Sequence, residues 1–232
     1  YLGVAIDGGF ASHVLVPDSR YLFPYEPLPA GFAAALMCSG LTAYGALKRA
    51  LAHPRRRNLL LVGMGGVGLM GIAIARALAI DTVAVADLSD AARAAALDAG
   101  ATTAYDPAAR ETARRMLKDS GGGFDVIIDF AGSESSMAFA MGALARGGKI
   151  IVSGLMGGAF NTPVVSWVHR RMSIEGFMTG TLNEARELLD LARTGRIAPV
   201  PMHEAPMRDA AHWMKQLREG NVTGRIILTN DA

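Results

Sequence analysis

The sequence predicts an α/β fold in which short apolar strands alternate with helices. A continuous apolar run, 59–62, leads directly into a glycine-rich turn, 63–68, and then into a helical pattern, 69–78. A second apolar run, 82–86, follows and ends at Asp87. Strands buried on both faces of a parallel sheet form such continuous apolar runs, and parallel strands need crossover helices between them.

The same alternation continues along the middle of the chain. We expect helices over 91–99, 110–118 and 136–144, and further strands over 124–130, 149–153 and 173–178. Gly100 follows the first of these helices, in the position where helices commonly end. Right-handed crossovers then place the strands in one parallel sheet, whose ligands bind beyond the carboxyl ends of the strands.

The two ends of the chain have a different character. Residues 7–17 are typical of a glycine turn followed by an alternating strand, and a proline-rich loop comes next. At the other end we expect helices over 183–193 and 209–219 and a strand over 225–229. Neither end is predicted to form a complete domain by itself.

The glycine-rich turn has the spacing G-x-G-x-x-G of a dinucleotide-binding turn. Gly63 permits the tight turn, Gly65 lets a pyrophosphate approach the backbone, and Gly68 lets the helix pack closely on the sheet. The backbone N–H groups at the start of the helix, including those of Gly66 and Val67, would face the anion. The motif alone is weak evidence for function, because glycine-rich turns occur in many folds.

Asp87 strengthens the nucleotide interpretation. It closes the second predicted strand, where the dinucleotide motif places a carboxylate for the ribose hydroxyls. Its negative charge would repel a 2′-phosphate, so we expect the chain to prefer NAD to NADP. A glycine turn and an acidic residue after the second strand also occur in methyltransferases, and the turn has a purely structural interpretation as well.

Composition excludes several other classes of protein. The formal net charge is +2 with charges interspersed, so neither nucleic-acid nor membrane binding is expected, and Arg55-Arg56-Arg57 is interpreted as a solvated loop. We expect no apolar stretch long enough to span a bilayer and no signal peptide. The single cysteine excludes an internal disulfide and fits a reducing, cytoplasmic location.

The order of these motifs resembles the zinc-dependent, medium-chain alcohol dehydrogenases over nearly the whole chain. The match runs from 8–11 (GGFA) through the glycine turn to 224–228 (GRIIL), and the segment 38–47 (CSGLTAYGAL) is its most specific part. The resemblance implies a Rossmann-type, doubly wound parallel sheet with remnants of a GroES-like, mainly-β catalytic domain at both ends. The implied domains are a catalytic-domain remnant (1–39), a dinucleotide-binding domain (40–179) and a C-terminal return to the catalytic domain (180–232).

The resemblance also assigns residues. Cys38 takes the position of a ligand to the catalytic zinc, and Thr42 takes a position that touches the nicotinamide. Segments that hold the nicotinamide carboxamide are matched by residues just past two strands, and Arg225 matches a pyrophosphate contact. The complete set of proposed cofactor contacts is Thr42, Gly63, Gly65, Gly66, Val67, Gly68, Asp87, Arg93, Phe130, Gly154, Leu155, Met178, Thr179 and Arg225.

Other family features have no counterpart in this sequence. The leading segment of the family supplies a Cys and a His-Glu pair as further zinc ligands, a Ser/Thr–His proton relay and, in many members, a four-cysteine zinc lobe. We therefore expect that the sequence omits an N-terminal portion. We assign no catalytic residue in this chain, and none of its histidines (His13, His53, His169, His203, His212) shows ligand spacing. The chain is expected to bind NAD without zinc and without turning over alcohol.

The predicted function of the intact protein is NAD-dependent, zinc-assisted interconversion of an alcohol and an aldehyde or ketone. Two alternatives stay open: a zinc-independent quinone or enoyl reductase of the same superfamily, and a non-catalytic NAD-binding module. A methyltransferase is disfavoured by the Cys38 segment and by residues 224–228. The expected partners are a small alcohol or carbonyl substrate and further copies of the chain, joined through the edge strand at 173–178 as a homodimer or homotetramer.

Overall fold

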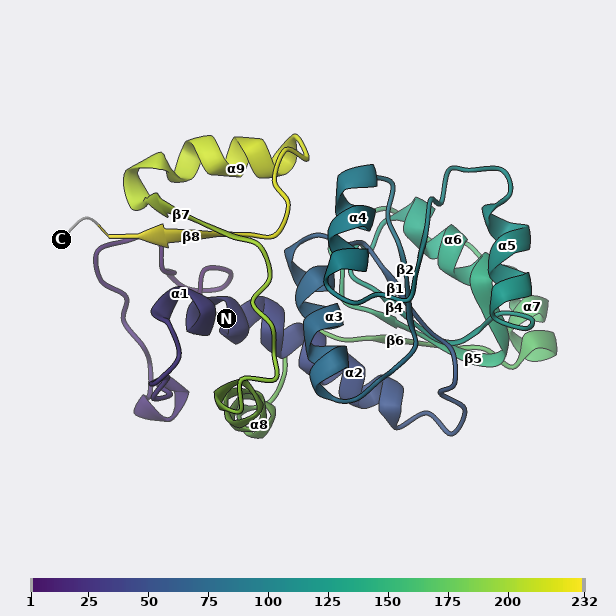
Figure 1. Cartoon of the computed structure of the whole chain (residues 1–232), viewed down its shortest axis with the longest axis horizontal. Coiled ribbons are helices and arrows are strands. Elements are labelled where there is room, and N and C mark those ends of the chain that lie inside the picture. Colours follow the sequence, from purple (N-terminus) through teal and green to yellow (C-terminus); the bar gives the residue numbers. More distant parts are fainter. Residues whose placement is uncertain (1, 231–232) are drawn as a thin grey trace.

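The computed structural model describes residues 2–230 and arranges them in two lobes (Figure 1). One lobe is built on a six-stranded sheet, and the other holds both ends of the chain. The order of strands in the large sheet is β3-β2-β1-β4-β5-β6, and every neighbouring pair is parallel. The predicted α/β class and its doubly wound parallel sheet are confirmed.

Five of the six strands of the large sheet lie at the predicted runs, although β5 begins at Leu144 instead of at 149, and β3 was not predicted. Leu61 of β1 pairs with Val85 of β2 on one side and with Ile128 of β4 on the other. The strands are β1 (Leu59–Val62), β2 (Val83–Ala86), β3 (Thr103–Tyr105), β4 (Phe124–Asp129), β5 (Leu144–Val152) and β6 (Ser173–Gly176).

Helices cover both faces of this sheet, because its strands are apolar on both sides. Leu59 and Leu61 pack into one buried cluster, with α2 (Leu41–Leu51), α3 (Gly66–Ala77) and α4 (Asp90–Asp98). Leu60 and Val62 point the other way, into a second cluster with α5 (Thr112–Asp119) and α6 (Glu134–Ala143). The short helix α7 (Val164–Arg170) precedes the edge strand β6.

The second lobe combines segments from both ends of the sequence (Figure 1). Its C-terminal strands pair with each other as a two-stranded sheet, with Met202 opposite Arg225. The predicted C-terminal helices and strand are therefore confirmed. The elements of this part are η1 (Ser19–Tyr21), α1 (Ala30–Ala35), the π-helical turn η2 (Leu36–Gly40), α8 (Leu182–Arg193), β7 (Met202–Pro206), η3 (Met207–Asp209), α9 (Ala210–Arg218) and β8 (Arg225–Thr229).

The strand expected within 7–17 is wrong. The structure assigns no strand there, and only an isolated bridge joins Leu2 to Ile6. An extended segment becomes a strand only when its backbone groups pair with a neighbour. Within residues 2–230, β7 and β8 pair with each other and not with this segment. The Asn230 side chain donates hydrogen bonds to the carbonyls of Ala11 and Ser12.

The expectation that no apolar segment is long enough to cross a membrane is also wrong by length and composition. α1, the π-helical turn and α2 form one continuous helical run, Ala30–Leu51, of 22 residues, and the mean hydropathy of its most apolar 18-residue window is 1.4. A core helix meets the same criteria, and 67% of this helix's most apolar window is buried inside the protein. The run also passes uninterrupted through positions 39 and 40, so no linker separates the lobes there.

Candidate functional site

The glycine-rich turn joins β1 to α3 at the carboxyl edge of the sheet. Gly63 has φ +85°, a left-handed conformation that glycine adopts without strain, and its N–H donates to the Ala86 carbonyl at 2.9 Å. A Cβ added to Gly68 would lie 2.1 Å from the Gly63 oxygen, so the helix packs where no side chain fits. Around Gly65, in contrast, no described atom lies within 4 Å of an added Cβ. The turn is therefore closed on its sheet side and open at Gly65.

Asp87 lies at the end of β2 and is tied to this turn. Its Oδ2 accepts a hydrogen bond from the Met64 N–H at 2.6 Å, and its Oδ1 accepts one from the Ser89 N–H at 2.8 Å. Each carboxylate oxygen can accept a second hydrogen bond. The structure thus brings Asp87 and the glycine turn together, with the carboxylate orientation fixed by the backbone.

The start of β8 reaches across from the second lobe to the amino end of α3. A Cβ added to Gly66 would lie 2.3 Å from Arg225 Cδ and 2.7 Å from the Gly224 oxygen. The predicted positions 66 and 225 are therefore neighbours despite their separation in sequence. Among the described residues, two buried side-chain polar atoms have no hydrogen-bond partner, Arg225 Nε and Ser153 Oγ. Buried polar atoms are seldom left unpaired, so this pattern fits a site for a polar ligand.

The loops after β4 and β5 contact each other closely through their backbones. A Cβ added to Gly132 would lie 2.0 Å from the Gly154 oxygen. The first loop is organised by Asp129, which is fully buried and which sequence reasoning missed. Its Oδ1 accepts from the N–H groups of Ala131 and Gly132 at 2.9 and 3.0 Å, and its Oδ2 accepts from Ser136 Oγ at 2.7 Å. An acidic residue in the last position of an apolar strand is the signal that could have found it.

Two of the predicted cofactor contacts have side chains engaged by the protein itself. The Phe130 ring lies against α3, where a Cβ at Gly71 would meet it at 3.2 Å. Arg93 donates to the Asp87 and Leu88 carbonyls at 2.6 and 3.0 Å. These contacts pack α3 and secure the end of β2, and a direct contact of either side chain with a cofactor stays a prediction.

The loop after β6 lies beside the start of α2. A Cβ added to Gly180 would lie 2.6 Å from the side chain of the first residue of α2, which places this loop next to the half-buried Thr42. Thr179 has φ +60°, a left-handed conformation that is uncommon for threonine. The side chains of Leu155 and Met178 are 82% and 50% exposed. Leu155 thus follows β5, Met178 and Thr179 follow β6, and the loop after β6 approaches the amino end of α2, which carries Thr42.

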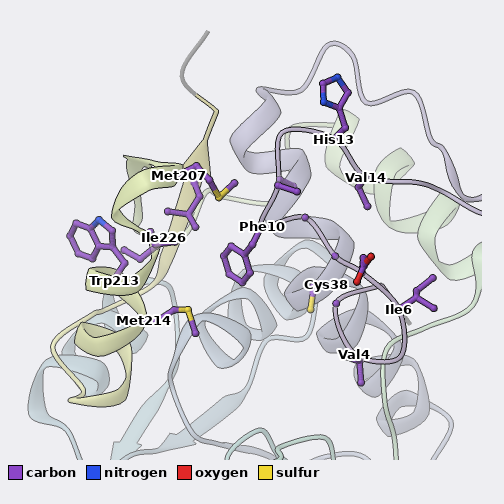
Figure 2. Close-up of a pocket in the computed structure, with 18 of the residues that line it drawn as sticks. Val4, Ile6, Phe10, His13, Val14, Cys38, Met207, Trp213, Met214 and Ile226 are labelled. Carbon is purple, nitrogen blue, oxygen red and sulfur yellow. The ribbon is translucent and has the colours of Figure 1, made fainter.

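Cys38 lies in the π-helical turn between α1 and α2, and it lines the same cleft as Arg225. Its exposed side chain lines a cleft of about 1450 Å³ between the N-terminal segment and α9. Figure 2 shows Cys38 beside Phe10 and Ile6, with Trp213 and Met214 on the opposite wall. The cleft is mainly apolar.

The described residues do not by themselves fit a zinc ion. Within residues 2–230, no group of three or more His, Cys, Asp or Glu side chains is placed to hold a metal. A catalytic zinc takes three protein ligands around one open position, and Cys38 offers one. A zinc site at Cys38 would need ligands from outside the described residues.

The six-stranded sheet and the residues at its carboxyl edge define a Rossmann-type α/β protein, in which an acidic residue, Asp87, is hydrogen-bonded to the glycine turn. A family model described as zinc-binding dehydrogenase matches residues 66–194, which is more than half of the chain. The chain belongs to this family of oxidoreductases.

Individual relatives agree with this assignment. The chain is 31% identical over 229 residues to the NAD-dependent alcohol dehydrogenase of Sulfolobus acidocaldarius and 29% identical over 226 residues to an alcohol dehydrogenase of Geobacillus stearothermophilus. The alignments cover 98% and 97% of this chain but 66% of each relative, so the chain spans about two thirds of their length. The crystal structure of the Aeropyrum pernix alcohol dehydrogenase superposes with a TM-score of 0.84 at 26% identity, covering 98% of this chain and 67% of that one.

Proposed function

We propose that the chain binds NAD at the carboxyl edge of the six-stranded sheet and belongs to an enzyme that interconverts an alcohol and an aldehyde or ketone. The observation that carries the proposal is the tethered Asp87 carboxylate beside a glycine turn that is open only at Gly65. The relatives named above, which are NAD-dependent or other alcohol dehydrogenases, supply the reaction class.

The adenosine half of the cofactor would lie over β1 and β2. The second lone pairs of the Asp87 oxygens would accept from the ribose hydroxyls. The backbone N–H groups of Gly66, Val67 and Gly68 begin α3, and the positive end of the helix dipole favours a pyrophosphate there. Arg225, which lies on Gly66 with its Nε unpaired, would add a charge-assisted hydrogen bond.

The nicotinamide half would lie between β5, β6 and α2. Gly154, Leu155, Met178 and Thr179 would present backbone groups to the carboxamide, and Thr42 would contact the ring from α2. When bound, NAD accepts or donates the hydride, and the protein supplies its orientation. The exposed apolar side chains of Leu155 and Met178 would exclude water from the nicotinamide face.

Zinc assistance of the reaction would require ligands beyond those that the described residues offer. Cys38 is proposed as one ligand of the zinc, and the described residues offer no complete ligand set. The domain boundaries at 39/40 and 179/180 also stand as proposals. The substrate would meet the cofactor on the Cys38 side of α2.

We also propose that the chain pairs with a second copy through β6. This strand is last in the sheet, so one of its edges is free of a hydrogen-bonded neighbour within the described chain. Beside it, α7 exposes Val164, Val165 and Val168 by 62–79%. An open strand edge next to exposed apolar side chains favours association.

Titration calorimetry with NAD and NADP tests the cofactor proposal. NAD should bind more tightly by about 1–3 kcal/mol, the scale of a charge-assisted hydrogen bond. Asp87→Ala should narrow this preference, whereas Asp98→Ala, an exposed carboxylate at the far end of α4, should leave it unchanged. Equal or tighter binding of NADP by the unmodified chain would contradict the role of Asp87, and binding of neither nucleotide would overturn the proposal.

A further inference from the structure

Arg49 on α2 contacts both ends of residues 175–184, a segment that comprises the end of β6, the connecting loop and the first turn of α8. Its Nε lies 3.3 Å from Glu175 Oε1, and its Nη1 lies 3.2 Å from Glu184 Oε1. Between these two ion pairs the guanidinium carbon lies 3.9 Å from the centroid of the Phe177 ring. The Arg49 side chain thus contacts Glu175 at the start of this segment, Phe177 within it and Glu184 at its end.

The edge of the Phe177 ring also rests directly on α2. A Cβ added to Gly45 would lie 2.4 Å from Phe177 Cζ, so the ring fits against α2 only because glycine is there. The Gly45 carbonyl accepts a hydrogen bond from Arg49 Nη1 at 2.9 Å, which fixes the guanidinium above the ring. The Arg49 side chain is 31% exposed, and a partly desolvated cation–π contact is stronger than one at an open surface.

The far end of the segment is held by the same arginine through Glu184. This carboxylate is buried, and its second oxygen accepts from the Thr181 N–H at 2.8 Å, which forms the capping box of α8. Between the anchors lies Thr179 with φ +60°. A non-glycine residue in this conformation persists only where the surrounding structure holds it.

We infer that Arg49 is a positioning residue for the nicotinamide end of the cofactor, an inference that rests on the proposed function. The residues between its two anchors include Met178 and Thr179, which we propose to hold the carboxamide. Without Arg49 the segment would spend part of its time in other arrangements, and apparent affinity falls in proportion to the competent fraction. The sites proposed for the adenosine half, at Asp87 and the glycine turn, have no contact with Arg49 among those described.

A comparison of two ligands tests this inference. Calorimetry on the 232-residue chain would compare NADH with ADP-ribose, which lacks the nicotinamide. Arg49→Met should weaken NADH binding about tenfold, corresponding to a segment that is competent about a tenth of the time, and should change ADP-ribose binding less than twofold. Arg49→Lys, which keeps the charge but not the guanidinium fork, should restore part of the NADH affinity.

Lys48 is a matched control on the same helix. It pairs with Glu187 of α8 at 2.6 Å and so joins the same two helices, but it has no described contact with residues 175–184. Lys48→Met should leave the binding of both ligands unchanged. If Lys48→Met lost as much NADH affinity as Arg49→Met, the loss would come from weakened packing of α2 against α8 and not from release of residues 175–184.

The remaining outcomes are also decisive. Equal weakening of NADH and ADP-ribose by Arg49→Met, or no weakening of either, would overturn the inference. Failure of the unmodified chain to bind either ligand would instead overturn the proposed function. If Arg49→Met does not fold, Phe177→Leu serves instead, because it keeps both ion pairs and removes the ring. Phe177→Leu should give the same selective loss of NADH binding to a smaller degree. Equal weakening of NADH and ADP-ribose binding by Phe177→Leu would count against the inference.

Discussion

Replacing Gly68 with alanine tests the packing of the glycine turn directly. The new Cβ would lie 2.1 Å from the Gly63 carbonyl oxygen and 3.0 Å from its carbonyl carbon. These are backbone atoms, so the turn and α3 must separate, and overpacking of this kind costs about 3 kcal/mol at the upper end of its usual range. Alanine recovers about 1 kcal/mol of helix propensity, which leaves a net loss of about 2 kcal/mol.

Gly65→Ala is the matched control, because an added Cβ there has nothing within 4 Å among the described residues and φ is −72°. Thermal unfolding should show a melting temperature lowered by about 4–8 °C for Gly68→Ala, using about 2–4 °C per kcal/mol for a chain of this size. Gly65→Ala should change the melting temperature little. Its methyl group would instead occupy the open approach to the turn, so NADH binding, measured by fluorescence titration, should weaken.

Two results would refute this reasoning. A Gly68→Ala variant that melts within about 1 °C of the unmodified chain would show that the turn accommodates a side chain. A Gly65→Ala variant that binds NADH as well as the unmodified chain would show that the pyrophosphate does not approach the backbone there.

Three further predictions concern titration and assembly. Burial of Glu184 opposes its charge, but hydrogen bonds from the Thr181 backbone and side chain and from the Arg49 guanidinium outweigh this effect and lower the pKa of Glu184. The ionised Glu184 should therefore stabilise the folded chain above about pH 4.5, and this contribution should be lost as the pH falls further. In urea unfolding, Glu184→Gln should therefore differ most from the unmodified chain near neutral pH and least in acid. Burial, and hydrogen bonds to Glu187 and Asp119, raise the pKa of Tyr44 and Tyr105 to about 12, so ultraviolet titration should show two of the five tyrosines ionising late; both ionising near pH 10 would contradict these contacts. Ile174→Lys should lower the mass measured by light scattering if β6 joins two copies, whereas Ile174→Ala, which removes similar packing without adding a charge, should lower it less.

The large sheet was predictable because local pattern and packing agree in it. The run Leu59–Val62 is buried along its whole length, so it is apolar at every position and reads plainly as an interior strand. Where burial is partial, the pattern fades. β3 has three residues, of which only Tyr105 is buried, and β7 exposes Met202, His203 and Glu204, so neither shows an apolar run.

The parts of the site that sequence reasoning missed depend on contacts between distant residues or with backbone. Arg49 and Glu184 are 135 positions apart, and neither residue stands out in its own helix. Asp129 binds mainly backbone N–H groups, which leave no partner residue type to recognise in the sequence. The strand predicted at 7–17 fails for a related reason. The alternation of apolar and polar residues is a property of the segment itself, but a strand forms only when the backbone pairs with a neighbouring strand.

The π-helical turn Leu36–Gly40 sets the rotation of the whole N-terminal segment about the helix axis. A π turn holds one residue more than an α turn, and each residue of an α-helix advances about 100° around the axis. Because the extra residue is contained within one turn, deleting one residue would restore regular α-helix and leave α1 facing nearly as it does now. Winding all the present residues as regular α-helix would instead rotate α1, together with everything before it, by about 100° relative to α2. Because residues 3–17 form one wall of the cleft at Cys38, the π-helical turn keeps that wall facing α9 while the helical run carries one extra residue.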